Sequence, residues 1–331
     1  GVLNEAGLAW RHQMLLAKNQ AATHHHKFSV HVATWSVGKI TPPSLAGWLE
    51  PGHNLYCVCA QDIQCMPLPA WLSLVRSTVG ASYSVVSSSA QGEMAIAVLV
   101  ETQFLDFYCH LGSGQNVEDI EHGGSVYVGG ELFGTRMFFA NLSLPEQASL
   151  DDRSDTVRRL VSQVSFTGMS KVDIFSNFHH SFLAGGFNYG LDLNAKMEKQ
   201  YSEAFAFCND PDQKPKALLQ LFRNDSLSKD VKANRVLTLA QEGVVHFPPT
   251  FKSTVGQTEW KPQAGQPCAW GSRVLWYSQP SCFAAQIPHS YKSLPHITTS
   301  THKPVSALFA VAPTTLLPTH DITEATESLT L

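Results

Sequence analysis

The chain has 331 residues, and 44% of them are hydrophobic, which is enough to bury a substantial core in one large domain. Its formal net charge of −4 does not favour binding to nucleic acid or to anionic lipid. The sequence has no run of about 18 apolar residues, which argues against a transmembrane helix.

The first 26 residues are predicted to form an N-terminal helical extension. Leu8, Leu15 and Leu16 have the spacing of an apolar helix face, and Arg11 and Lys18 accompany them. Two interpretations stay open for residues 1–26. They are a surface helix packed on the domain, or the remnant of a targeting segment, since the first 20 residues hold a single acidic side chain.

Residues 27–313 are predicted to form one domain in which strands and helices are interspersed. β-Branched and aromatic content marks the strands, and apolar stripes or terminal charges mark the helices. In chain order we expect strands at Phe28–Trp35 and Leu55–Ala60, a helix at Pro67–Val79, strands at Ala95–Val100, Phe104–His110, Ser125–Val128 and Arg136–Leu142, helices at Asp151–Val164, Asn194–Phe207 and Lys216–Phe222, and strands near Phe283–Ile287 and Val305–Val311. This order predicts a four-layer α/β sandwich, with two mixed β-sheets face to face and helices outside.

The remaining residues, 314–331, are predicted to be a C-terminal extended tail. The segment is rich in threonine, and its scattered Leu316, Leu317, Ile322 and Leu329 cannot build a core of their own.

Cysteine usage indicates a reducing, intracellular compartment. The count of seven is odd, and Cys57 and Cys59 lie two apart in a predicted strand, so they share one face and make a poor disulfide. Cytoplasm and mitochondrion both stay open. Asn141-Leu142-Ser143 matches a glycosylation sequon, but its apolar flanks predict a buried strand.

A glycine-rich segment near the middle of the chain, Gly185-Gly186-Phe187-Asn188-Tyr189-Gly190, resembles the G-D-L-N-Y-R signature of the inositol polyphosphate 5-phosphatases. Further segments resemble other motifs of that family and follow its order; they are Val32–Ser36, His53–Asp62, Phe139–Leu144, Phe247–Lys252, Trp270–Trp276 and Ser300–Val305. The resemblance implies an endonuclease/exonuclease/phosphatase-like fold. It also implies Mg²⁺-dependent hydrolysis of the 5-phosphate of inositol phosphates and phosphoinositides, a reaction that needs carboxylates, an acceptor for the proton of water and donors for phosphate.

Most of the family's chemical positions hold a different residue in this chain. The resemblance implies that Gly186 replaces the water-activating Asp, Gly190 an Arg, Ser143 a phosphate-contacting His, and Gly123 a substrate-recognition Lys. The site positions are the replaced Ser36, Ser143, Gly186, Gly190, Ser272 and Thr301, the conservatively changed Asp62, and the identical Asn188 and His302. Asp62 is then a vestigial metal position, left almost alone to hold Mg²⁺.

These substitutions lead to three functional hypotheses. The first is a pseudoenzyme that serves as a structural or scaffolding subunit of a larger assembly, with no cofactor and with partner proteins bound through the terminal extensions. The second is a 5-phosphatase with residual Mg²⁺-dependent hydrolysis. The third is a non-hydrolysing binder of inositol phosphate or phosphoinositide that uses Lys252 and Arg273. Trp35, Trp270 and Trp276 are expected in the core.

Overall fold

A computed structural model describes residues 27–119, 123–166, 171–192, 207–259, 269–280 and 282–314. The predicted N-terminal extension, the predicted helix at Asn194–Phe207 up to its last residue, and the predicted tail beyond Thr314 lie outside these ranges.

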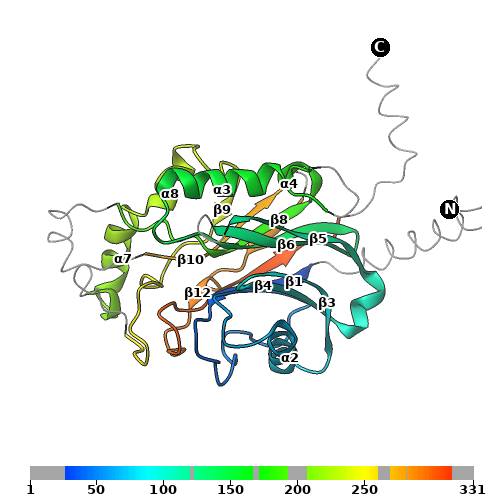
Figure 1. The fold of residues 1–331 in the computed structure, drawn as a ribbon, viewed down its shortest axis with the longest axis horizontal. Helices are drawn as coiled ribbons and strands as arrows, with labels where there is room; N and C mark the ends of the chain where they lie inside the picture. The colour runs from blue at the N-terminus through cyan, green and yellow to red at the C-terminus, as the bar shows by residue number, and fades with distance from the viewer. Residues whose placement is uncertain are drawn as a thin grey trace, which may run out of the picture.

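The strands of the described chain form two mixed sheets that face each other (Figure 1). The first sheet contains β1 (Phe28–Ser36), β2 (Leu55–Gln61), β3 (Tyr83–Gln91), β4 (Met94–Glu101), β11 (Ala284–Gln286), β12 (Lys292–Ser293) and β13 (Val305–Val311). The second contains β5 (Tyr108–Asp119), β6 (Gly123–Leu132), β7 (Thr135–Ser143), β8 (His180–Gly186), β9 (Gln241–Glu242) and β10 (Ser272–Ser278). The strand orders are β11-β13-β1-β2-β4-β3, with β12 beside β13, and β5-β6-β7-β8-β10-β9.

Helices cover the outer faces of both sheets, which confirms the predicted four-layer sandwich. Helix α2 (Leu68–Val79) lies on the first sheet, and α3 (Leu150–Ser162), α4 (Ile174–Asn177) and α8 (Ser226–Lys232) lie on the second, with α7 (Lys214–Phe222) at one end (Figure 1). The start of α3 is encoded locally by a capping box. The Ser149 hydroxyl accepts from the Asp152 amide at 3.1 Å, and the Asp152 carboxylate accepts from the Ser149 amide.

Three apolar clusters fill the three interfaces between the four layers. Alternation along β1 illustrates the arrangement: Val30 and Val32 pack between the sheets, whereas Ala33 and Trp35 pack toward α2. Trp35, Trp270 and Trp276 are buried, as predicted, with exposed fractions of 0%, 1% and 7%.

The prediction that Cys57 and Cys59 share one face of a strand without forming a disulfide is confirmed. Cys57 and Cys59 are both buried between the sheets and free, with their sulfurs 3.8 Å apart. Asn141 of the sequon is buried in β7, also as predicted. No helix in the described ranges is long and apolar enough to cross a bilayer.

The strand predicted at Phe104–His110 is wrong in its first half. Thr102–Phe107 forms a 3₁₀ helix, η1, and β5 begins only at Tyr108. The aromatic residues that suggested a strand pack instead on Phe133, whose ring centroid lies 5.2 Å from that of Phe104 and 5.4 Å from that of Phe107.

Two parallel strand pairs end at the same edge of the sandwich. In the first sheet β1 and β2 run parallel and end with Ser36 opposite Gln61. In the second, β7 and β8 run parallel and end with Ser143 opposite Gly186. This edge therefore collects residues from four strand ends, one pair from each sheet.

Two adjacent glycines at the end of β8 are expected to differ in their tolerance of a side chain. A Cβ at Gly185, where φ is +144°, would lie 2.1 Å from the Leu142 carbonyl oxygen, whereas a Cβ at Gly186 would meet Asn188 at an ordinary 3.5 Å. We expect Gly185→Ala to lower the free energy of unfolding by about 1–3 kcal/mol and Gly186→Ala to leave it nearly unchanged. Urea unfolding of both variants measures the difference, and equal midpoints would contradict the close approach of β7 and β8.

Candidate functional site

A cleft of about 480 Å³ opens at the edge where the four strands end. Six of the nine site positions line it: Ser36, Asp62, Ser143, Gly186, Asn188 and His302. Gly123, at the start of β6, also lines it. The other three positions, Gly190, Ser272 and Thr301, are not among the lining residues.

Asp62 and Ser36 face each other across the ends of β1 and β2. The Ser36 hydroxyl donates a hydrogen bond to Oδ2 of Asp62. Asp62 has φ at +52°, in the left-handed region that aspartate tolerates better than most residues. One oxygen of this carboxylate is therefore already engaged by the protein.

A buried amide pair, Gln61 and Asn141, joins the two sheets next to the cleft, and Gln61 lines it. Asn141 on β7 donates to the carbonyl oxygens of Ala60 at 2.8 Å and Ala95 at 2.9 Å, both in the first sheet. Its Oδ1 accepts from Nε2 of Gln61 at 2.5 Å, and the same Nε2 lies 3.0 Å from Oγ1 of Thr34. Gln61 Oε1 is left without a hydrogen-bond partner among the described residues.

Asn188 lies beside Gly186, just after the end of β8 in the second sheet. Its Nδ2 donates to the Leu144 carbonyl oxygen at 2.7 Å, which orients the amide and leaves Oδ1 unpaired within the described chain. A Cβ placed on Gly186 would lie 3.5 Å from Nδ2 and 3.9 Å from Oδ1 of Asn188. The cleft thus keeps the space that a side chain at position 186 would fill.

His302 closes the cleft from the loop before β13. Its ring stacks on Phe251 with centroids 4.4 Å apart, and its Nε2 lies 3.5 Å from Oε1 of Glu146. Nδ1 has no partner in the described residues, although the side chain is only 7% exposed.

The three site positions outside the cleft lie behind or beside it. Ser272 pairs with Gly186 across β10 and β8 and is fully buried. The carbonyl of Thr301 accepts from the Ser253 amide at 2.7 Å. Gly190 has φ at +75° and, as a glycine, no side chain that could reach the cleft. Its carbonyl accepts from the Ser226 amide at 3.1 Å.

The charged side chains that line the cleft are acidic, apart from His302. They are Asp62, Glu93 and Glu146, and no Lys or Arg belongs to the described lining. Arg153 lies close by, but its guanidinium donates to the carbonyl oxygens of Pro145 at 3.0 Å and of Glu146, behind the lining. The cleft therefore carries a negative field.

Arg273 lies away from the cleft in a buried ion-pair network. Its side chain is 1% exposed, and it pairs with Asp225 at 3.0 Å and with Glu242, which also accepts from the Tyr291 hydroxyl at 2.8 Å. Burial alone would lower the pKa of Arg273, but Asp225 and Glu242 raise it well above its usual value. This placement favours a structural role over the predicted ligand contact. Lys252 is half-buried next to Phe251 and is likewise not among the residues lining the cleft.

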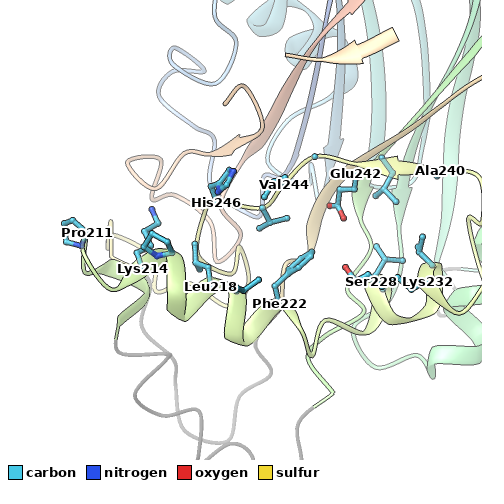
Figure 2. A pocket seen from close by; sticks show the side chains of 17 residues that line it. Pro211, Lys214, Leu218, Phe222, Ser228, Lys232, Ala240, Glu242, Val244 and His246 are labelled. Carbon is cyan, nitrogen blue, oxygen red and sulfur yellow. The ribbon is translucent and has the colours of Figure 1, made fainter. Parts of the chain in front are cut away.

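A second and larger hollow, of about 650 Å³, was not anticipated from the sequence. Figure 2 shows Lys214, Leu218 and Phe222 projecting from α7 along one wall, with Glu242 and Val244 on the opposite side. Its described lining is mostly apolar, and Glu242, the one carboxylate among those residues, already pairs with Arg273. The smaller cleft holds more of the polar side chains that chemistry requires.

Comparison with known proteins places this site in a family context. The family model described as Endonuclease/Exonuclease/phosphatase family 2 matches residues 33–308. Human phosphatidylinositol polyphosphate 5-phosphatase type IV is 27% identical over 305 residues, which cover 86% of this chain and 46% of that protein. Human phosphatidylinositol 4,5-bisphosphate 5-phosphatase A is 27% identical over 322 residues, covering 85% of this chain and 30% of that protein. The chain thus spans less than half the length of these curated relatives.

Two solved structures share the fold. The inositol polyphosphate 5-phosphatase domain of SPsynaptojanin, in complex with inositol (1,4)-bisphosphate and calcium ion, superposes with a TM-score of 0.71 at 21% identity and covers 90% of each chain. Cimex nitrophorin, solved as a ferrous NO complex, superposes with a TM-score of 0.66 at 18% identity, over 87% of this chain and 99% of its own. The same architecture therefore serves more than one chemistry.

The buried network around Arg273 predicts a large stability effect. Arg273→Ala leaves Asp225 and Glu242 buried without their cation, so we expect it to lower the free energy of unfolding by about 3–5 kcal/mol. The exposed pair of Arg158 and Asp155 provides a matched control, since Arg158→Ala should cost less than about 1 kcal/mol. Chemical denaturation compares the two variants. A small loss for Arg273→Ala would restore the case for a ligand-binding role.

Proposed function

Because the chain belongs to the endonuclease/exonuclease/phosphatase family and is homologous to its inositol polyphosphate 5-phosphatases, we propose that it is a catalytically inactive member, a pseudoenzyme that serves as a structural or scaffolding subunit of a larger assembly. The observation that carries the proposal is the cleft itself. It lies where the two parallel strand pairs end and gathers six of the nine site positions, yet Gly186 stands where the resemblance implies the base that activates water.

Loss of the base removes the first requirement of hydrolysis. A general base in the right place is worth about 10²–10⁴ in rate. Gly186 has no side chain, and its neighbour Asn188 cannot accept a proton from water at neutral pH. The other acid–base side chains of the described lining are His302, Asp62, Glu93 and Glu146. His302 lies against Glu146 and Phe251, and Asp62 accepts from Ser36.

The donor set also fits Mg²⁺ poorly. Mg²⁺ demands near-ideal octahedral oxygen geometry and is held through carboxylates together with substrate phosphates. Asp62 already accepts from Ser36, and no group of three or more His, Cys, Asp or Glu side chains in the described ranges converges as a metal site. No step of a metal-assisted reaction is therefore assigned to these residues.

The charge of the cleft opposes a phosphorylated substrate as well. Enzymes that act on phosphate surround it with Arg, Lys or metal cations. The described lining here holds Asp62, Glu93 and Glu146 instead. This field argues against the alternative of a non-hydrolysing inositol phosphate or phosphoinositide binder at this cleft.

A scaffolding role is supported by what the chain retains. The three apolar cores and the amide bridge between the sheets stabilise the domain whether or not it is catalytic. A folded domain of this size can present its surface and its two terminal extensions to partners. Retention of Asp62, Asn188 and His302 in one cleft favours residual Mg²⁺-dependent phosphatase activity as the second candidate function.

Phosphate release distinguishes these two candidates. The purified chain with millimolar Mg²⁺ is expected to release no phosphate from 5-phosphorylated inositol phosphates or phosphoinositides above a buffer control. Gly186→Asp should fold normally, because its Cβ meets only Asn188 at 3.5 Å or more, and it should stay inactive since cations and metal ligands are still lacking. Mg²⁺-dependent turnover by the unmodified chain that disappears in Asp62→Ala would overturn the pseudoenzyme assignment.

The terminal extensions give the test of the scaffolding role. Deleting residues 1–26 or 314–331 should leave the melting temperature nearly unchanged, because both segments lie outside the 27–313 domain, and should weaken incorporation into the native assembly. Thermal melts and co-purification of partner polypeptides measure the two effects. Unfolding of the truncated chains with intact partner binding would instead make the extensions part of the core.

A further inference from the structure

The cleft is rich in hydrogen-bond acceptors and poor in donors. A phosphate site has the opposite balance, because phosphate oxygens only accept and must be met by N–H and O–H groups. Here the three lining carboxylates, Asp62, Glu93 and Glu146, contribute acceptors alone. Side-chain donors in the described lining are neutral, such as the hydroxyl of Ser143.

Gln61 adds an unpaired acceptor whose identity is fixed by its neighbours. Asn141 must turn its NH₂ toward the Ala60 and Ala95 carbonyls, so its oxygen faces Gln61. Gln61 must then present its own NH₂ to Asn141, which leaves Oε1 as the free atom and excludes a flipped amide. Gln61 is only 1% exposed and lines the cleft, so this oxygen is a buried acceptor without a donor in the described chain.

Asn188 and His302 also hold buried polar atoms without a partner in the described chain, but these atoms face Gly271, which is not among the lining residues. Asn188 gives its NH₂ to the Leu144 carbonyl, so Oδ1 is the unpaired atom. His302 is 6% exposed and turns Nε2 toward Glu146, which leaves Nδ1 without a partner in the described chain. Both free atoms flank Gly271, where a Cβ would lie 2.6 Å from Asn188 Oδ1 and 3.6 Å from His302 Nδ1. A buried acceptor without a partner is unfavourable, and a bound donor that reaches it removes that penalty.

We propose that this cleft binds a nitrogen cation, a guanidinium or ammonium group carried on an apolar stem. Such a group brings several N–H donors for the unpaired acceptor of the cleft. It also brings one positive charge to balance the three carboxylates. The apolar side chains of Met94, Leu144 and Pro145 line the same cleft and can pack along the carbon stem. A volume of about 480 Å³ holds a side chain or metabolite of that size.

Other ligands match the cleft less well. A polyanion would meet three carboxylates and no Lys or Arg of the described lining. A divalent metal ion needs converging ligands, and the described residues provide no group of three His, Cys, Asp or Glu side chains at one point. Planar guanidinium, by contrast, can bridge separated acceptors through its five N–H groups.

The inference deepens the proposed function, on which it rests, because an inactive cleft can hold a ligand without converting it. A guanidinium can come from a free metabolite or from an arginine on a partner protein, and the cleft would recognise the same chemistry in both. Two probes separate these sources. Agmatine represents the free cation, and the capped tripeptide acetyl-Gly-Arg-Gly-amide represents a protein side chain.

Calorimetric titration of the full chain tests the proposal. Saturable binding is expected for at least one probe, and tighter binding of the peptide than of agmatine would identify protein arginine as the source. The matched peptide with citrulline in place of arginine keeps the shape but loses the charge, and it should bind at least about tenfold more weakly. Inorganic phosphate, inositol 1,4,5-trisphosphate and Mg²⁺ should give no saturable heat.

Two conservative variants locate the site. Asp62→Asn and Glu146→Gln should each weaken binding by about tenfold, since each removes one charge while keeping the side-chain shape. Asp106→Asn is the matched control, because Asp106 is exposed on η1 after the far end of β4, and it should bind as the unmodified chain does. Thermal melts establish that the variants fold.

The inference is overturned if neither probe binds at about 1 mM, if the citrulline peptide binds as well as the arginine peptide, or if Mg²⁺ or the trisphosphate saturates the cleft instead. Phosphate release measured on the same sample distinguishes failure of the proposed function from failure of the proposed cation binding. Turnover would overturn the proposed function, whereas a silent cleft with neither turnover nor cation binding would overturn only this inference.

Discussion

The geometry of the cleft depends on a buried amide, Asn141, that ties one sheet to the other at the edge where the four strands end. Apolar side chains between two sheets resist separation, but they set relative position only loosely because dispersion and hydrophobic contacts have little directionality. The hydrogen bonds from Asn141 to Ala60 and Ala95 are directional and span the gap at one edge. They hold the ends of four strands at a defined separation, and the cleft exists because those ends cannot slide together.

The motifs around the cleft divide into residues that build the fold and residues at chemical positions. Gly185 lets β8 approach Leu142, the Tyr189 hydroxyl lies 3.0 Å from that of Ser154, and the Trp270 indole donates to the Phe247 carbonyl at 2.9 Å. Gly185, Tyr189 and Trp270 match the motifs of the family that the chain resembles, and each of them acts in packing. Position 186, by contrast, has a glycine that packing does not require. The packing of these motifs therefore does not depend on the side chain at position 186.

Sequence patterns predicted the layers well because burial leaves a periodic trace. The strands at Phe28–Ser36 and Leu55–Gln61 and the helix at Leu68–Val79 lie where hydrophobic alternation or an apolar stripe predicts them. Strand β3 was missed because serines fill much of Tyr83–Gln91, and only its pairing with β4 makes it a strand. Motif order grouped nine positions into one predicted site, and six of them line the cleft. The role of Arg273 was beyond reach, since its partners Asp225 and Glu242 are far away in sequence and no local pattern announces an ion pair.

The left-handed backbone at Gly190 makes positions 186 and 190 differ in how readily each would accept a charged side chain. The space over Gly186 would accept a carboxylate without any rearrangement. Room is also free around Gly190, but φ is +75° there, and an arginine would hold its backbone in a conformation that costs a β-carbon-bearing residue about 1–2 kcal/mol. The two positions are therefore unequal targets for engineering. A carboxylate at 186 needs no change of backbone, whereas a cation at 190 calls for the loop from 188 to 191 to be rebuilt as well.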